Sequence, residues 1–153
     1  MTPNPVRTPL EWNEREGILK FLYVGRLEKI KGIDLLMKAW DQILDEEATL
    51  TIVGSGSLTE YIREFPSKRV NFIGAVDDNT LFKEYAKADI FIYPTLWDSL
   101  PTTVLEALSN GLFIITSTIM KSTFSQEEND DFIEFILSDP THIADSIKMD
   151  NPK

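Results

Sequence analysis

The strongest constraint on the fold of this chain is the alternation of short apolar runs with segments of helical spacing. Six short runs rich in β-branched and aromatic residues predict strands at 19–24, 49–53, 69–73, 89–93, 112–116 and 132–136. Five segments predict helices at about 33–46, 57–65, 78–87, 101–110 and 141–149. Such alternation indicates right-handed βαβ units. We therefore expect an α/β fold, with a parallel sheet of about six strands and helices on both faces.

Charge and composition exclude several classes of function. The chain has 153 residues, with 15 Lys and Arg against 25 Asp and Glu, and its net charge of −10 argues against a nucleic-acid partner. It contains no Cys, so a disulfide framework and a thiolate zinc site are excluded. No apolar run approaches the roughly 18 residues that would span a bilayer, and residues 1–7 lack the apolar segment of a signal peptide. We expect a cytoplasmic protein with no membrane segment in this chain.

Two further stretches bear on the organisation of the chain. Residues 1–17 contain Pro3, Pro5 and Pro9, which remove amide donors and favour an irregular, linker-like segment. The domain itself is expected to cover 18–153. The acidic cluster at 127–131 is typical of a solvated loop.

The first loop, residues 25–32, is a candidate anion site. Ligands of open parallel sheets bind at the carboxyl ends of the strands, and this loop follows the first predicted strand. Gly25 allows close backbone approach, and Arg26, Lys29 and Lys31 precede the next helix. A helix N-terminus offers unpaired amides, so added cations there favour phosphate. An exposed basic loop in an acidic protein explains the same residues equally well.

The fourth loop, residues 94–101, and the helix after it carry two carboxylates. Asp98 lies in the loop, and Glu106 lies eight residues later, one turn after Thr102. Helical side chains lean toward the helix N-terminus, so Glu106 can point back toward the same crevice. We expect Ser99 or a neighbour to cap this helix. The two carboxylates and the helix amides suit a ligand with vicinal hydroxyls and a phosphate, although Glu106 is also compatible with an exposed helix position.

Taken together, these segments resemble a known family. The stretch from Leu22 to about Ser117 resembles the C-terminal, donor-binding domain of a GT-B glycosyltransferase of family GT4. The resemblance covers roughly two-thirds of the chain, and it implies a Rossmann-like sheet, one half of a GT-B fold. Its matching pieces, in order, are VGRLEKIKGID at 24–34, LTIVGSG at 50–56, VNFIGAV at 70–76, YAKAD at 85–89 and YPTLWDSLPTTVLEALSNG at 93–111.

The resemblance implies sugar transfer, with retention at the anomeric carbon, from a nucleoside-diphosphate sugar to a saccharide or lipid-linked acceptor. It implies that Arg26 and Lys31 hold the diphosphate, that Val76 contacts the base through its backbone and that Glu106 binds the ribose. Asp98 stands where the family has a Glu that contacts the donor sugar. The nucleotide sugar is a substrate, and neither a separate cofactor nor a metal is expected. The implied donor-binding residues are Gly25, Arg26, Lys31, Val76, Asp98, Ser99, Leu100, Thr102 and Glu106.

The sequence departs from the family pattern in three respects. Asp98 is shorter than the usual Glu, and the segment 118–123 has no Gly where the family usually has a Gly-containing loop. The acceptor-binding N-terminal domain of the family has no counterpart here. We therefore expect a donor half that is inactive alone and meets its acceptor, or a membrane surface, through another domain. No residue is assigned as a nucleophile or general base.

Three alternatives remain open from the sequence. A degenerate donor domain would bind a nucleotide or partner without transferring a sugar. A sugar-nucleotide epimerase would share the architecture. A dinucleotide-binding oxidoreductase would use Gly54 and Gly56, but Thr59 stands where its third Gly belongs.

Three further residues have simpler interpretations. Trp40 is expected in the core and His142 at the surface. Trp97 is expected either to form a wall of the sugar pocket or simply to pack.

Overall fold

The computed structural model describes residues 18–43, 48–66, 69–99, 101–124 and 132–150. Its six strands form one sheet in the order β3-β2-β1-β4-β5-β6, and every neighbouring pair is parallel. This arrangement confirms the expected α/β fold. The strands are β1 (Leu19–Val24), β2 (Ala48–Val53), β3 (Val70–Gly74), β4 (Ile90–Tyr93), β5 (Phe113–Ser117) and β6 (Ile133–Ile136).

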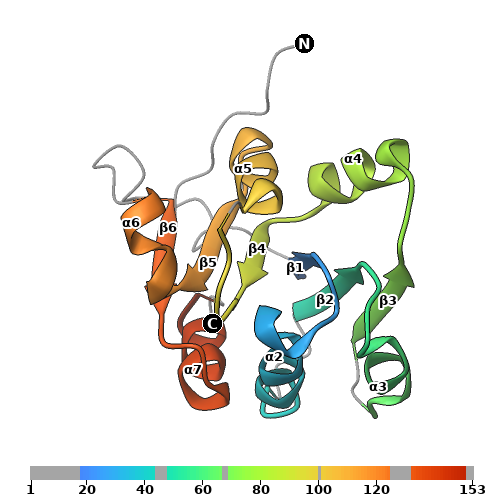
Figure 1. Ribbon diagram of the computed structural model, residues 1–153, viewed down its shortest axis with the longest axis horizontal. Helices are drawn as coiled ribbons and strands as arrows, with labels where there is room; N and C mark the ends of the chain where they lie inside the picture. Colours follow the sequence, from blue (N-terminus) through green and yellow to red (C-terminus); the bar gives the residue numbers. More distant parts are fainter. Residues whose placement is uncertain (1–17, 44–47, 67–68, 100, 125–131, 151–153) are drawn as a thin grey trace.

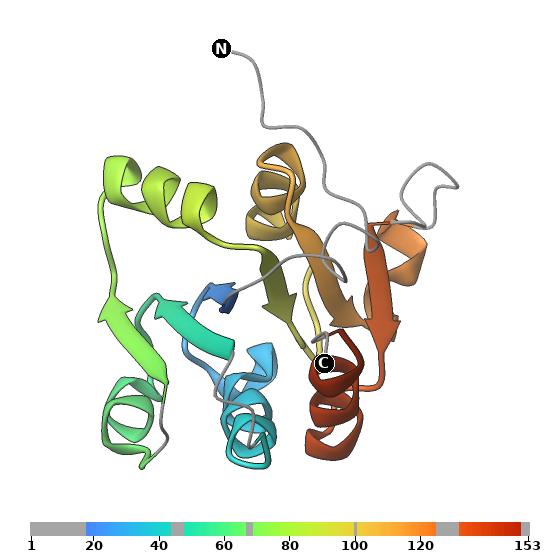
Figure 2. The ribbon, with the colours of Figure 1, turned by 180° about the vertical axis from the view of Figure 1, so that it is seen from behind.

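Helices cover the sheet from both sides. In Figure 1, α7, α2 and α3 form a row along one side, and α4 and α5 lie along the other. Figure 2 shows the same two groups from behind. Two 3₁₀ turns, η1 (Lys29–Lys31) and η2 (Thr118–Met120), lie in connections. The helices are α2 (Ile33–Trp40), α3 (Thr59–Glu64), α4 (Asp78–Lys87), α5 (Thr102–Ser109), α6 (Lys121–Phe124) and α7 (Pro140–Asp150).

The core lies on both sides of the central strands. All four residues of β4 are buried, as expected for a parallel strand between two helical layers. Helix α2 buries Ile33, Leu36 and Trp40, which recur at helical spacing. Trp40 is 1% exposed and meets Phe21 edge to face, with 5.6 Å between ring centroids. The prediction that Trp40 belongs to the core is confirmed.

One local expectation differs from the structure, and two fall outside its described part. The helix expected to reach residue 46 ends at Trp40. The segment 118–123, which lacks the Gly of the loop usual in the family, forms η2 and most of α6, and Met120 is buried. The linker-like segment 1–17 and the acidic cluster 127–131 lie outside the described residues.

The topology positions the site. From β1 the chain moves outward through β2 and β3, and α4 then carries it back to β4, on the other side of β1. The loops after β1 and β4 therefore leave the sheet in opposite directions. Crevices that bind ligands in open α/β sheets form at such a reversal. In the described part of the chain, no helix has an apolar stretch long enough to cross a bilayer.

Candidate functional site

The first and fourth loops are clamped together at this reversal. The backbone N–H of Leu96 donates to the Ile30 carbonyl at 2.8 Å. Gly32 has a φ of +76°, and a Cβ added there would lie 1.9 Å from the carbonyl oxygen of Pro94. Only glycine fits both this backbone conformation and this contact. The clamp brings the cations of the first loop to the carboxylate of the fourth.

Lys31 and Asp98 meet across the clamp. The Lys31 ammonium lies 3.3 Å from Asp98 Oδ2, and the two side chains are only 15% and 10% exposed. The Tyr93 hydroxyl donates to the same Oδ2 at 2.6 Å. Burial, followed by the hydrogen bond to Asp98, raises the pKa of Tyr93 well above its usual value. The phenol therefore remains protonated and acts as a donor at neutral pH.

Gly25 allows these groups to pack closely. A Cβ at Gly25 would lie 3.0 Å from a ring carbon of Tyr93 and 3.2 Å from the Tyr23 hydroxyl oxygen. That hydroxyl donates to the Arg26 carbonyl at 2.6 Å and so fixes the turn that begins the first loop. Burial raises the pKa of Tyr23, so it too stays protonated.

The Arg26 side chain lies on the solvent side of the loop. It is 76% exposed, and its guanidinium lies 3.6 Å from Glu28 Oε2. Glu28 accepts from the backbone N–H of Ser57 at 3.0 Å and from the Ser57 hydroxyl. These hydrogen bonds, the largest influence, lower the pKa of Glu28. Glu28 thus anchors Arg26 near the crevice while leaving most of the guanidinium accessible.

The start of α5 offers backbone amides. Its N-cap is Pro101, which makes no side-chain cap, and its first turn holds no acidic residue. The expectation that Ser99 caps the helix is therefore wrong, because the helix begins at Thr102, three residues later. Ser99 and Thr102 are both exposed, and Leu100 lies outside the described residues. The N-cap residue therefore supplies no side-chain acceptor to the first N–H groups of α5.

Glu106 is held from the neighbouring helix. Its Oε1 accepts from the Tyr85 hydroxyl at 3.0 Å, and Tyr85 also contacts the Thr103 carbonyl at 3.3 Å. Burial, followed by Glu106, raises the pKa of Tyr85. Glu106 is exposed, as the alternative interpretation of the sequence expected, and it also lines a cavity of about 270 Å³ between α4 and α5. The cavity is lined by Asp78, Leu81, Phe82, Tyr85, Glu106 and Asn110.

A family assignment follows from comparison with known proteins. The sequence profile of a family described as "Glycosyl transferases group 1" matches residues 19–149. The chain belongs to this family. The resemblance drawn from the sequence motifs is thereby confirmed.

Two curated relatives show the extent of the similarity. The chain is 34% identical over 104 residues to "Uncharacterized glycosyltransferase MJ1607" of Methanocaldococcus jannaschii, covering 64% of this chain and 27% of the relative. It is 30% identical over 97 residues to "Sulfoquinovosyl transferase SQD2" of Arabidopsis thaliana, covering 63% of this chain and 19% of the relative. The matched region is therefore roughly a quarter of each relative's length, or less.

Two solved structures confirm the fold as one Rossmann-like half of a GT-B glycosyltransferase. The C-terminal domain of a glycosyl transferase group 1 protein, LpcC of Francisella tularensis, superposes with a TM-score of 0.71 at 17% identity, covering 97% of this chain and 84% of that one. The pneumococcal O-GlcNAc transferase GtfA, solved with UDP and GlcNAc, gives a TM-score of 0.66 at 25% identity. This match covers 87% of this chain and 28% of GtfA.

The remaining predicted residues of this glycosyltransferase chain lie as follows. Val76 is partly buried and precedes Asp77, the N-cap of α4, but it does not line the cavity beside Glu106. Trp97 is 59% exposed in the fourth loop, which excludes simple core packing for its ring. His142 is 53% exposed beside Asp139, as expected for a surface residue. Within the described ranges, no group of three or more His, Asp or Glu side chains is arranged to hold a metal.

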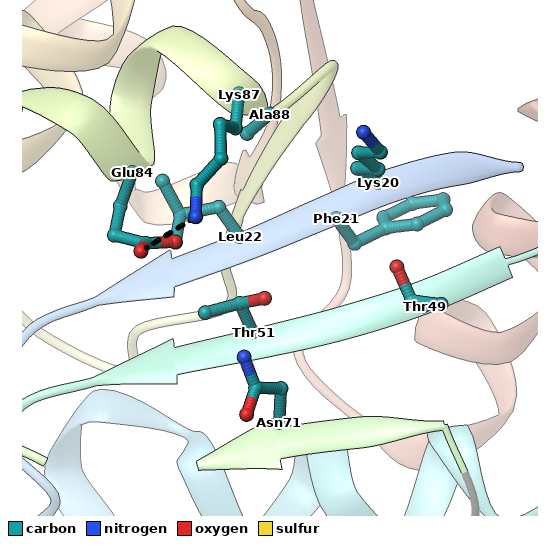
Figure 3. A pocket seen from close by; sticks show the side chains of 9 residues that line it. All are labelled: Lys20, Phe21, Leu22, Thr49, Thr51, Asn71, Glu84, Lys87 and Ala88. Carbon is teal, nitrogen blue, oxygen red and sulfur yellow. Dashed lines mark ion pairs between the residues drawn. The ribbon is translucent and has the colours of Figure 1, made fainter. Parts of the chain in front are cut away.

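A second cavity, of about 300 Å³, lies away from the loops (Figure 3). It is on the face of β1, β2 and β3 beside the end of α4, where Lys87 pairs with Glu84 at 3.1 Å. None of the predicted site residues lines it.

Sequence reasoning predicted the cations and carboxylates of the loops, but it missed Tyr93, Tyr85 and Glu28. Each of these three contacts a predicted residue or orients it. The only signal in the sequence was their position near strand ends or on a facing helix.

Proposed function

We propose that this chain is the donor-binding domain of a retaining glycosyltransferase that moves a sugar from a nucleoside diphosphate to a saccharide or lipid-linked acceptor. Membership of the group 1 family supports sugar transfer. The likeness to GtfA, whose structure holds UDP, supports a nucleotide donor. The observation that carries the proposal is the mostly buried Lys31–Asp98 pair, which joins the first and fourth loops at the strand reversal. The fourth loop leads into α5, whose N-cap Pro101 makes no side-chain cap.

The diphosphate is the part of the donor that the loops suit best. Lys31 and the exposed Arg26 supply two cations, and the first amides of α5 supply hydrogen-bond donors. Gly25 begins the loop that would hold the phosphate and lets Tyr93 and Tyr23 pack against the start of that loop. As the bond to the sugar breaks, negative charge grows on the leaving phosphate, and fixed cations and amides stabilise it.

The nucleoside is expected to lie toward α4. The Glu106 carboxylate accepts hydrogen bonds and can take two from the ribose hydroxyls. Tyr85 holds one of its oxygens in place. Val76, just before α4, is proposed to contact the base through its backbone. Ser99, Leu100 and Thr102 are proposed to face the phosphate or the sugar.

Acceptor binding is proposed to belong to another part of the protein. The curated relatives are several times longer than their matched regions, which leaves room for such a part. We therefore expect this chain to bind donor without transferring its sugar. No residue described here is assigned as a nucleophile.

A binding panel tests the proposal. Thermal unfolding is followed with UDP, GDP, ADP and their glucose or mannose conjugates, for the unmodified chain and for Lys31→Ala. A ligand at one hundred times its Kd should stabilise the unmodified chain by about 2.7 kcal/mol, and Lys31→Ala should lose most of this effect. No stabilisation by any of these nucleotides at millimolar concentration would refute the proposal.

A further inference from the structure

The carboxylate of Asp98 is already engaged within the protein. Its Oδ2 accepts the hydrogen bond from Tyr93 at 2.6 Å and pairs with Lys31 at 3.3 Å. The Asp98 side chain is 10% exposed. A sugar hydroxyl would have to reach a carboxylate that is nine-tenths covered and has one oxygen shared by two donors.

Solvent reaches this network from the Lys31 end. The Lys31 ammonium also contacts the Trp97 carbonyl oxygen at 3.4 Å, and that contact is exposed. The Tyr93–Asp98 hydrogen bond, by contrast, is partly buried. The Lys31 side chain is also slightly more exposed than that of Asp98, at 15% against 10%, so the ammonium is the part of the network that an anion can approach.

Fixing this ammonium has a clear physical value. A lysine head on a flexible stem loses side-chain entropy when a ligand immobilises it. Asp98 and the Trp97 carbonyl already restrict the Lys31 side chain in the free protein, so less entropy is lost when the ligand binds. The Tyr93 hydroxyl in turn orients the carboxylate, since its ring is packed against Tyr23 with 5.7 Å between centroids.

We infer that Asp98 is a positioning residue for Lys31 and does not contact the donor sugar. The inference rests on the proposed function, because it takes the diphosphate as the ligand of Lys31. Selection of the sugar then belongs to other groups of the crevice.

Titration calorimetry on the 153-residue chain tests this inference. The probes are three matched pairs: UDP with UDP-glucose, GDP with GDP-mannose, and ADP with ADP-glucose. For the pair that binds best, Asp98→Asn should weaken the diphosphate and the nucleotide sugar by the same factor, roughly three- to tenfold. In a Lys31→Ala background, Asp98→Asn should cause no further loss, because its effect acts through Lys31.

Two other variants guard against a general effect. Tyr93→Phe keeps the ring packing and changes no charge, so it should weaken both ligands equally, with a smaller loss than Asp98→Asn. If circular dichroism shows that Asp98→Asn does not fold, Tyr93→Phe replaces it in the test. Asp41→Asn removes an equal charge from the exposed C-terminal end of α2 and should change neither affinity.

Three results would overturn the inference. A loss confined to the nucleotide sugar would make Asp98 a sugar contact. Unchanged or tighter diphosphate binding would show that Lys31 needs no positioning. If Asp98→Asn weakened binding in the Lys31→Ala background as much as in the unmodified chain, the two residues would act independently. If the unmodified chain binds none of the six probes, the proposed function itself fails and this inference fails with it.

Discussion

The Lys31 ammonium and the Asp98 carboxylate lie 3.3 Å apart and join the loops that follow β1 and β4. These loops leave the sheet in opposite directions, and the ion pair links them at the strand reversal. Because both side chains are mostly buried, the pair is shielded from salt. A ligand that contacts one loop is therefore held by a unit made of both.

Replacing Arg26 should weaken nucleoside-diphosphate binding. Its guanidinium is exposed and anchored by Glu28, so it can contact phosphate oxygens. Arg26→Ala should raise the Kd about tenfold, the scale of a hydrogen bond to a charged group, when measured by calorimetry at fixed ionic strength. Lys29→Ala is the matched control, since it removes an exposed cation from the same loop, and it should change the Kd by about twofold at most. Equal losses in the two variants would indicate a general electrostatic effect in place of a contact.

Replacing Glu106 should remove discrimination for the ribose. Glu106→Gln keeps the shape of the side chain but removes its negative charge and replaces one oxygen, which accepts hydrogen bonds from hydroxyls, with an NH₂ group that donates them. We expect about tenfold weaker binding of a ribonucleoside diphosphate and a smaller loss for its 2′-deoxy analogue, compared by calorimetry.

The control for Glu106 is Glu84→Gln, which makes the same change on α4 at the other cavity. It should leave both affinities unchanged. The ribose assignment would be abandoned if Glu106→Gln weakened the two analogues equally.

Gly32→Ala should destabilise the fold more than Gly74→Ala. Both glycines have a φ of +76°. A Cβ at Gly74 meets only a Phe72 ring carbon at 4.0 Å, whereas at Gly32 it meets the Pro94 carbonyl oxygen at 1.9 Å. Gly74→Ala should therefore cost the left-handed backbone penalty of about 1–2 kcal/mol, and Gly32→Ala distinctly more. The free energy of unfolding in urea measures both, and equal costs would disprove the close packing of the two loops.

The N-cap of α4 should make part of the stability depend on pH. The Asp77 carboxylate accepts from the Thr80 N–H at 2.8 Å, and this hydrogen bond lowers its pKa below the ordinary 3.8. A lowered folded-state pKa means that the stabilisation is complete above the unfolded pKa and is lost as the pH falls through the folded one. The difference in melting temperature between the unmodified chain and Asp77→Ala should thus be constant from pH 7 to pH 5 and narrow below pH 3.8.

Asp77→Asn serves as the control for this pH dependence. It keeps a capping oxygen without a titrating group, so its difference from Asp77→Ala should not change with pH. If the difference in melting temperature between the unmodified chain and Asp77→Ala stayed constant below pH 3.8, the Asp77 carboxylate would not be the source of the pH dependence.

The sheet and the placement of the charged loops could be predicted because they depend on local pattern. The alternation of strands and helices predicts that the strands are parallel. Lys31 and Asp98 both follow carboxyl ends of strands, which places them at one edge of the sheet. The partners Tyr93 and Tyr85 could not be predicted, because their contacts depend on strand register and on how α4 packs beside α5.

The prediction for Ser99 failed for a reason of chain geometry. Ser99 suits a cap by residue type, but Pro101 delays the helix to Thr102. The departure from the family at 118–123 has a structural counterpart: with neither Gly nor Pro, the segment forms helical turns, and burial of Met120 holds them against the core.

The start of α5, where the N-cap Pro101 provides no side-chain cap, has a dynamic consequence. A first turn whose amides have no cap frays more readily than the rest of the helix. An anion held there would complete the hydrogen bonds of that turn, so that donor capture and the ordering of α5 become one coupled event. Amide hydrogen exchange at Thr102 and Thr103 should accordingly slow when the donor binds. The exchange rate of these two amides would then report how much of the protein has donor bound.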